Sequence, residues 1–321
     1  GHLKGQLGIW AFDIENKSIT SVFKSLPGHT PLLVTSQLNV KNIIYQNTTK
    51  TINIENTGEL GITNLSNANS SMIDMNAVYS PNSKALYFSS NRSGSYDIWQ
   101  YQGNEVERIT NIQANMIERP IITKQEDKLA FLIRAKTNSE MIIFDIINKA
   151  AVTKISLPKK VFLLSWSNDQ KHIYFSAFED TQYNIYKLNV QTSEKEKILL
   201  NAGAIAQESL DGKYLYYGDM RNGQLMRETN LGETKVMFKV PANDLQGIMP
   251  HRLKVINNGL YYIAAHGRKS LLKHYSFTDK TLQIDIELPD DIYVTDIVDG
   301  KSVAVMFDRF SKINANLIEL R

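Results

Sequence analysis

The stretch 80–99 reads SPNSKALYFSSNRSGSYDIW, and its layout decides the fold. A polar turn precedes an apolar strand with an aromatic residue at a fixed offset, and a turn containing Gly94 leads into a second apolar strand. The layout recurs along the chain, with the aromatic slot taken by Tyr45, Phe88, Phe131, Phe175, Tyr217, Tyr262 and Val305. Successive slots are 42 to 45 residues apart. A fixed period of this size, built from short strands, predicts the blades of a β-propeller.

Each repeat is expected to contribute four antiparallel strands. The second strand carries the aromatic slot and follows turn dipeptides such as Asn258-Gly259, which allow the positive φ of a tight hairpin. The third strand carries an apolar anchor, namely Ile54, Ile98, Ile142, Ile185, Leu225, Leu271 and Leu317. Helical patterning is absent, and 64–75 is the only loop long enough for a helical turn. The predicted fold class is therefore all-β.

We interpret residues 1–321 as a single propeller domain, with seven blades favoured and eight or six as alternatives. The blade-like repeats lie near 32–65, 76–110, 118–155, 162–200, 204–238, 251–288 and 293–321. Residues 6–24 read as a closing hairpin. We expect an N-terminal strand to close the ring, with 18–23 or its neighbour completing the last blade, because such pairing removes an exposed sheet edge.

Composition limits the function classes. The 36 basic and 33 acidic residues leave a net charge of only +3, which argues against a dedicated nucleic-acid surface. No segment approaches the run of about 20 apolar residues that a membrane helix needs. Without cysteine there are no disulfides, thiolate metal sites or cysteine nucleophiles. The chain starts at Gly1-His2, without methionine or a signal segment, as expected of a fragment of a longer protein.

Motifs for known chemistry are weak. Asp299-Gly300-Lys301-Ser302 resembles the end of a phosphate loop, but position 295 is threonine where the loop needs glycine, so we interpret it as a hairpin turn. No Gly-x-Ser-x-Gly occurs, so no serine hydrolase elbow is encoded. His251 and His266 belong to one repeat, and two interpretations are open for them: convergence near the channel mouth, or a solvated or hydrogen-bonded structural role, which we favour because no further ligands accompany them. We expect no catalytic residues, no metal site and no cofactor.

The stretch 80–99 resembles the repeat of TolB-type propellers, which runs roughly Ser-Pro-Asp-Gly-Lys-x-Ile-x-Phe-x-Ser-x-Arg-x-Gly-x-x-Asp-Ile-Tyr. The matching positions that we assign to the structural motif are Lys84, Phe88, Arg92, Gly94 and Asp97. Weaker copies begin at Ser167 and Ser209, and the remaining repeats keep the hydrophobic skeleton. We expect Arg92 and Asp97 to pair across the turn between their strands.

Several classes of protein carry such repeats. TolB itself has a six-bladed propeller after an α/β domain that is not evident here. Prolyl oligopeptidase-like enzymes place a propeller beside a hydrolase domain, and oligogalacturonate lyases combine the repeat with a histidine-lined metal site. The degenerate repeats are most similar to the extracytoplasmic propeller of membrane-anchored CadC/ToxR-type regulators, which carry a cytoplasmic winged-helix domain.

The resemblance therefore implies a non-enzymatic sensor or interaction domain on the periplasmic side of the inner membrane. It would be attached to the membrane only through a segment outside this chain. Its partner would be a protein or a small polar or peptide ligand, without direct nucleic-acid binding, and a homodimer is allowed. The alternatives are a TolB-like periplasmic interaction scaffold, and a propeller lyase or hydrolase acting on polysaccharide or peptide.

The best place for a site is the channel end of the innermost strands, where each blade presents side chains toward the axis. The predicted ligand-binding residues there are Asp74, Asn76, Glu118, Arg119, Lys160, His251, Arg252, Tyr293 and Asp296. Their mixed charges suit a small polar ligand or a peptide, and the alternative for each residue is solvated channel lining.

Overall fold

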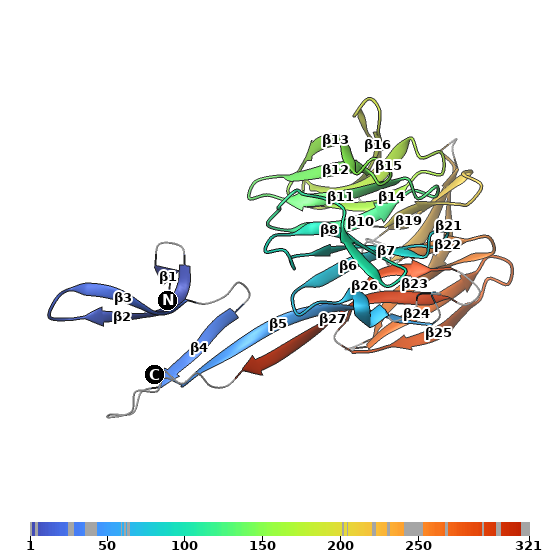
Figure 1. The fold of residues 1–321 in the computed structure, drawn as a ribbon. Coiled ribbons are helices and arrows are strands. Elements are labelled where there is room, and N and C mark those ends of the chain that lie inside the picture. The colour runs from blue at the N-terminus through green and yellow to red at the C-terminus, as the bar shows by residue number, and fades with distance from the viewer. Residues whose placement is uncertain are drawn as a thin grey trace.

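A computed structural model describes the chain apart from a set of excluded positions. These are residues 1, 4–5, 25–28, 36–43, 59, 61, 63–64, 201, 204, 220–222, 230–231, 241–252, 267–268, 291, 300–302 and 316–321. Six four-stranded antiparallel sheets are arranged as the blades of a propeller (Figure 1). The prediction of seven blades is therefore wrong, and the six-bladed alternative is the count that the described strands give.

Blades one to five each use four consecutive strands. Blade one is made of β6 (Asp74–Ser80), β7 (Ala85–Ser90), β8 (Asp97–Gln102) and β9 (Glu105–Arg108). Blade two is made of β10 (Ile117–Ile122), β11 (Lys128–Arg134), β12 (Ser139–Asp145) and β13 (Ala150–Leu157). Blade three is made of β14 (Val161–Trp166), β15 (His172–Glu179), β16 (Gln182–Asn189) and β17 (Lys195–Leu199). Blade four is made of β18 (Ala206–Glu208), β19 (Tyr214–Asp219), β20 (Gln224–Thr229) and β21 (Thr234–Lys239). Blade five is made of β22 (Leu253–Ile256), β23 (Gly259–His266), β24 (Lys269–Ser276) and β25 (Leu282–Leu288).

Blade six joins strands from both halves of the sequence. It is made of β26 (Ile292–Val298), β27 (Ala304–Ala315), β5 (Ile44–Thr57) and β4 (His29–Thr35), hydrogen-bonded in that order. The remaining strands β1 (His2–Leu3), β2 (Gln6–Asp13) and β3 (Ser18–Lys24) form a separate three-stranded sheet. Residues 18–23 therefore do not complete the last blade, and β5 is the strand that pairs with β27.

The repeat pattern maps onto the six blades once Tyr45 is reassigned. The aromatic slots from Phe88 to Val305 all lie on second strands and are buried. Tyr45 was expected to mark a seventh second strand, but it lies on β5, the third strand of blade six. Ile54, 1% exposed, is the third-strand anchor of that same blade. Leu317 lies outside the described residues, so its predicted role stays a prediction.

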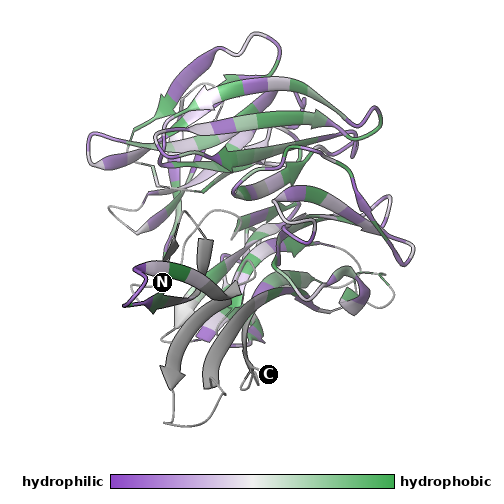
Figure 2. Ribbon diagram, turned by 60° about the vertical axis from the view of Figure 1, so that its left-hand side comes forward, coloured by the Kyte–Doolittle hydropathy of each residue, from purple (hydrophilic) through white to green (hydrophobic). Residues whose placement is uncertain are grey.

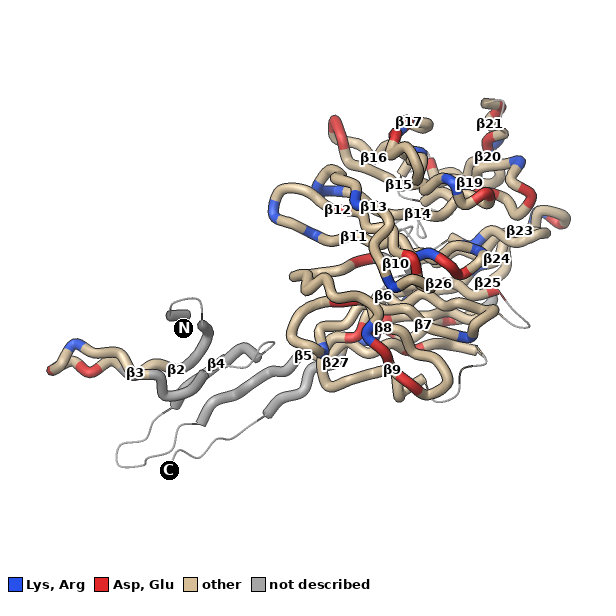
Figure 3. Tube along the Cα trace, turned by 45° about the horizontal axis from the view of Figure 1, so that its top comes forward, with Lys and Arg blue, Asp and Glu red and all other residues tan. Residues whose placement is uncertain are grey.

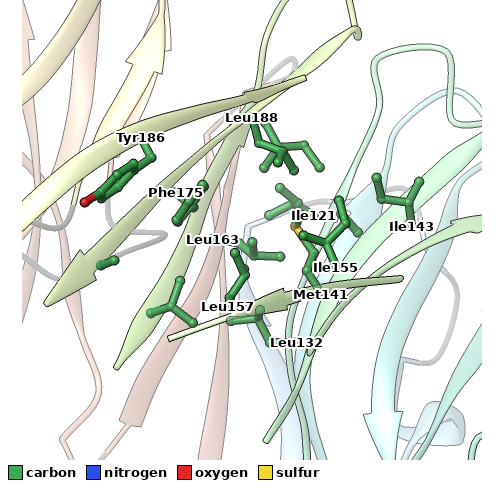
Figure 4. Packing of buried hydrophobic residues seen from close by; sticks show 14 of the residues in the cluster. Ile121, Leu132, Met141, Ile143, Ile155, Leu157, Leu163, Phe175, Tyr186 and Leu188 are labelled. Atoms are coloured by element: carbon green, nitrogen blue, oxygen red, sulfur yellow. The ribbon is translucent and has the colours of Figure 1, made fainter. Parts of the chain in front are cut away.

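The core is divided among the gaps between blades. Each neighbouring pair of blades shares one apolar cluster, because the buried strands carry β-branched, aliphatic and aromatic residues on both faces. Figure 2 shows these hydrophobic positions running along the strands while the loops are mostly hydrophilic. The cluster between blades two and three is drawn in Figure 4, where Leu132 and Met141 of one blade face Leu163 and Phe175 of the next.

Helical structure is confined to the loop in which it was expected. A single 3-10 turn, η1 (Leu65–Ala68), lies within 64–75 in the described part of the chain. No helix among the described residues is long and apolar enough to cross a membrane.

Candidate functional site

Most of the predicted site residues that the structure describes lie at one face of the ring, which we call the front face. It is the face at which the innermost strand of each blade begins and the second strand ends. The ladders place Asp74 opposite Ser90, Glu118 opposite Leu132 and Tyr293 opposite Asp308. Lys160 immediately precedes β14 at the same end of blade three. His251 and Arg252 lie outside the described residues.

Asp74 is a fully buried acceptor at this face. Its Oδ2 accepts hydrogen bonds from the Ser70 amide at 2.5 Å and the Ser70 hydroxyl at 2.7 Å. Its Oδ1 accepts from the Ser90 hydroxyl and from Nη2 of Arg92, both at 2.6 Å. All the bonding capacity of the carboxylate is directed inward, so Asp74 stabilises the blade and is not available to a ligand.

Arg92 belongs to the same hydrogen-bonded group. We call this group, composed of Ser70, Asp74, Ser90 and Arg92, the polar knot. Its Nη2 also donates to the carbonyl of Ala68 at 2.5 Å, and its guanidinium lies over the rings of Phe88 and Trp99 at 5.1 and 5.0 Å. A guanidinium over aromatic faces and beside a carboxylate is strongly fixed. The repeat residues Phe88 and Arg92 therefore serve as structural anchors.

The expected pair between Arg92 and Asp97 is wrong. Asp97 is fully buried and accepts from Nη2 of Arg108 at 2.5 Å, while its Oδ1 accepts from Thr110 and from the Ile112 amide. Arg92 thus binds the carboxylate of Asp74 on β6, whereas Asp97 accepts hydrogen bonds from the loop that follows β9.

Two other motif positions act through the backbone. Lys84 has φ +53 in the turn before β7, and Gly94 has φ +96 in the turn before β8. The turn at Gly94 requires a conformation that residues with side chains rarely adopt. Both positions shape the blade and lie outside the ring of predicted ligand-binding residues.

Glu118 links blades two and three. It accepts a hydrogen bond from Nε of Arg134 at 2.8 Å, and both side chains are about one-fifth exposed. Arg134 also donates to the carbonyls of Lys159 and Val161, each at 2.8 Å. The pair fixes the first residues of β14 at the front face and still leaves part of the carboxylate surface open to solvent.

Lys160 is exposed and lies beside an aromatic group. Its Nζ lies 4.5 Å from the ring centre of Phe178. Tyr183 contacts that ring edge-on at 5.0 Å and the ring of Phe162 at 5.5 Å. The three rings come from three strands of blade three and are all half-buried. They give the front face a cation on an aromatic platform.

The junction between blades six and one contains buried carboxylates. Asn76, with φ +57 in the bulge of β6, donates its amide to both oxygens of Asp308 at 3.0 Å. Burial raises the pKa of Asp308 well above its ordinary value, and the nearby charge of Asp74 raises it further. Asp296 accepts from the Tyr79 amide at 3.2 Å. Burial also raises the pKa of Asp296, against the opposing charge of Lys254.

Asp308 was not among the predicted residues. A single acid at the end of the apolar run 303–307 was the available signal, because an acid in a buried strand must find a donor. Tyr293 is half-buried at the start of β26, opposite Asp308 in the ladder. Arg119 lies in the irregular part of β10 between Glu118 and Ile121.

The structure thus brings Asp74, Asn76, Glu118, Lys160 and Tyr293 to one face, whereas Asp296 lies deeper in β26, where it bonds the Tyr79 amide near the opposite end of β6. Among the described residues there is no set of three His, Asp or Glu side chains arranged to hold a metal ion. His251 is outside the described residues, so the choice between convergence with His266 and a structural role stays a prediction. Glu118, Lys160 and Tyr293, which we call the front-face rim, stay predicted ligand-binding residues.

The sequence matches no protein-family model and no curated protein sequence. The fold is similar to a putative TolB from Agrobacterium tumefaciens, at 12% identity over 83% of this chain and 99% of that one, with a TM-score of 0.59. TolB from Acinetobacter baumannii is similar at 11% identity over 88% of this chain and 76% of that one, with a TM-score of 0.53. Pyrococcus horikoshii acylaminoacyl peptidase is similar at 12% identity over 91% of this chain, with a TM-score of 0.53, and the match spans about half (52%) of the peptidase. These similarities show the fold, a β-propeller that is similar to those of TolB proteins and of an acylaminoacyl peptidase.

Proposed function

We propose that the chain is a non-catalytic interaction propeller, and that it serves as the extracytoplasmic sensor domain of a membrane-anchored winged-helix transcriptional regulator. The front-face rim would receive a protein partner or a small polar or peptide ligand. Binding would change signalling only if the rim binds one of two states of the protein more tightly than the other.

The observation that carries this proposal is a short hydrogen-bonded path from the front face to the N-terminal strand β5. The side chain of Asn69 accepts from the Ile54 amide at 2.8 Å and donates to the Ile54 carbonyl at 2.9 Å. The next residue, Ser70, donates to Asp74, which in turn holds Arg92. A shift of the front-face knot would therefore reach β5 through two adjacent residues.

The path leads toward the N-terminal part of the chain. β5 is the strand of blade six that leads back toward the N-terminal part of the chain, where a CadC-like protein would carry its membrane helix. Attachment on this side agrees with the resemblance of the repeat to sensor propellers, and under this proposal the propeller would lie on the periplasmic side of the inner membrane.

The test uses the full-length parent protein. We expect its coding sequence to contain a winged helix and a membrane helix upstream of residue 1. Alkaline phosphatase fused after Arg321 should be active. A signal peptide followed by an α/β domain would overturn the sensor proposal in favour of a TolB-like periplasmic scaffold.

Transcription of the regulated genes in variants of the parent protein tests the path. Asn69→Ala in the parent protein should change transcription of the regulated genes, because it separates β5 from the Ser70–Asp74 knot. Lys213→Ala, at a 73% exposed lysine of blade four, is the matched control. Equal transcription in wild type and Asn69→Ala would remove the path from the mechanism.

A second candidate is the propeller of a larger hydrolase, which is favoured by the similarity to an acylaminoacyl peptidase. In that case the propeller would accompany a catalytic domain outside residues 1–321. An α/β-hydrolase sequence next to this chain, with peptidase activity of the whole protein, would establish this candidate and exclude the regulator.

A further inference from the structure

A groove of about 520 Å³ lies between the outer part of blade one and the face of blade two. Ile142 and Phe144 of β12 form its floor, and the loop that follows β9 contributes Ile112. The volume falls within the range of sites that hold small molecules or short peptide segments. None of the front-face residues lines it, so this surface is independent of the site on which the proposed function rests.

The charged side chains of the groove are all basic. Arg108, Lys149 and Lys154 line it, and no acidic side chain does so among the described residues. Lys149 is paired with Glu107, and Nη2 of Arg108 with Asp97. Lys154 is exposed and makes no ion pair within the described part of the chain. The unpaired charge of Lys154 beside the apolar floor favours a ligand that has an anionic group next to apolar groups.

The groove runs beside an open sheet edge. β13 is the terminal strand of blade two, and four of its first five side chains are exposed, including Ala151 and Lys154 of the groove. At the far end of β13, the Ser156 carbonyl accepts from Lys195 of blade three at 2.8 Å. Figure 3 shows basic positions around β12 and β13. A terminal strand presents backbone groups that an extended peptide can pair with, and the added strand points alternate side chains to one face.

We propose that blade two binds an extended acidic segment of a partner protein, which pairs with the Ala150–Lys154 part of β13 and places a carboxylate side chain against Lys154. Apolar side chains of the segment contact the floor at Ile142 and Phe144. Backbone pairing supplies the geometry, and the basic rim selects acidic over neutral segments.

The test is fluorescence anisotropy on the intact chain with a labelled octapeptide in which glutamate and valine take turns at every second position and threonine fills the positions between them, because Lys154 and Ile142 lie opposite each other on one face of the sheet. Saturable binding is expected. A matched octapeptide with glutamine in place of glutamate should bind about tenfold more weakly. A third octapeptide, with the glutamates kept and alternate backbone nitrogens methylated, should lose a similar factor because it cannot complete the strand pairing.

Protein variants locate the site. Lys154→Glu should weaken binding of the glutamate peptide about tenfold, and Lys154→Gln by a smaller factor. Lys213→Glu, an equal charge reversal at an exposed lysine of blade four, should change it less than about twofold. Circular dichroism of each variant reports whether the fold is kept.

Several results would overturn the proposal. One is an absence of saturable binding, and another is equal affinity for the glutamate and glutamine peptides. Equal weakening by Lys154→Glu and Lys213→Glu would show general attraction to a basic surface. Full binding of the methylated peptide would show an anion site without strand addition. None of these outcomes bears on the front face.

Discussion

The junction between blades two and three and the junction between blades six and one are stabilised in different ways. Blades two and three meet through the apolar cluster of Figure 4, in which Leu163 is fully buried, and their cross-blade hydrogen bonds from Arg134 join segments only 25 and 27 residues apart. Blades six and one also share apolar residues, but there the buried carboxylates of Asp308 and Asp296 accept amide hydrogen bonds from β6. The partners in those bonds are 232 and 217 residues apart. Apolar contact is non-directional, whereas a hydrogen bond to a fixed amide defines one register, which is what a junction between distant segments needs.

The largest expected effect is at the polar knot beside the six–one junction. Asp74→Ala should lower the free energy of unfolding by about 3–5 kcal/mol, because it leaves Arg92, whose side chain is 15% exposed, without its carboxylate. Urea denaturation followed by tryptophan fluorescence measures the loss. A cost below about 1 kcal/mol would show that the knot does not stabilise this side of the ring.

The apolar junction should respond nearly as strongly. Leu163→Ala should cost about 2–5 kcal/mol through lost burial and the cavity that remains. The control is Val152→Ala, at a 55% exposed position of blade two, which should cost less than about 0.5 kcal/mol. Similar costs for the two variants would mean that the cluster of Figure 4 does not hold blades two and three together.

A smaller effect should distinguish the junctions by pH. The raised pKa of Asp308 means that protonation stabilises the native state fully below the unfolded pKa of about 3.9, and that this stability is lost as pH rises through the native pKa. Asp308→Asn should therefore unfold with nearly the wild-type free energy at about pH 4. It should become the more stable protein toward pH 7, by about 1.4 kcal/mol for each unit of pKa shift.

A second carboxyl provides the opposite sign. Hydrogen bonds from Asn148 lower the pKa of the exposed Asp145, so its contribution is present above the unfolded pKa and is lost as pH falls. Asp145→Asn should thus be less stable than wild type near pH 7 and approach it in acid. The same pH dependence in both variants would contradict the assignment of Asp308 as a buried acid.

The smallest effect sets the baseline for both junctions. The side chains of Lys269 and Glu287 form an ion pair on blade five, and they are 54% and 58% exposed. Glu287→Gln should change the free energy of unfolding by less than about 1 kcal/mol, because water and salt screen exposed pairs. A larger loss in urea denaturation would mean that an exposed ion pair stabilises the protein about as much as the buried polar knot at Asp74 does.

Local pattern predicted the blades well. The positions from Phe88 to Tyr262 could be identified because a strand buried on both faces needs an apolar or aromatic residue at each repeat. The blade count could not be read in the same way. Tyr45 continues the period, yet β5 pairs with β27 from the other end of the chain, and pairing between distant segments leaves no signal in local spacing.

The site shows the same limit. Glu118 and Lys160 could be placed at the front face because the ends of strands follow from the repeat. Their partners Arg134 and Phe178 depend on how side chains fold back, and spacing does not determine this. The assignment of Arg92 to Asp97 is wrong for that reason: it rests on nearness along a hairpin, whereas Arg92 bonds the buried Asp74, 18 residues upstream.

The ladder between β5 and β27 has a mechanical consequence. Its register continues without a break from Val305–Thr57 to Ala315–Asn47, longer than the register of any other pair of strands in the described chain. A pull on the start of β5 against the ring would load these bonds in parallel, in shear, and would not open them one at a time. The strand that the regulator proposal uses to carry a signal is therefore also suited to bear tension, and force spectroscopy on a tether at the start of β5 would find its rupture among the strongest in the molecule.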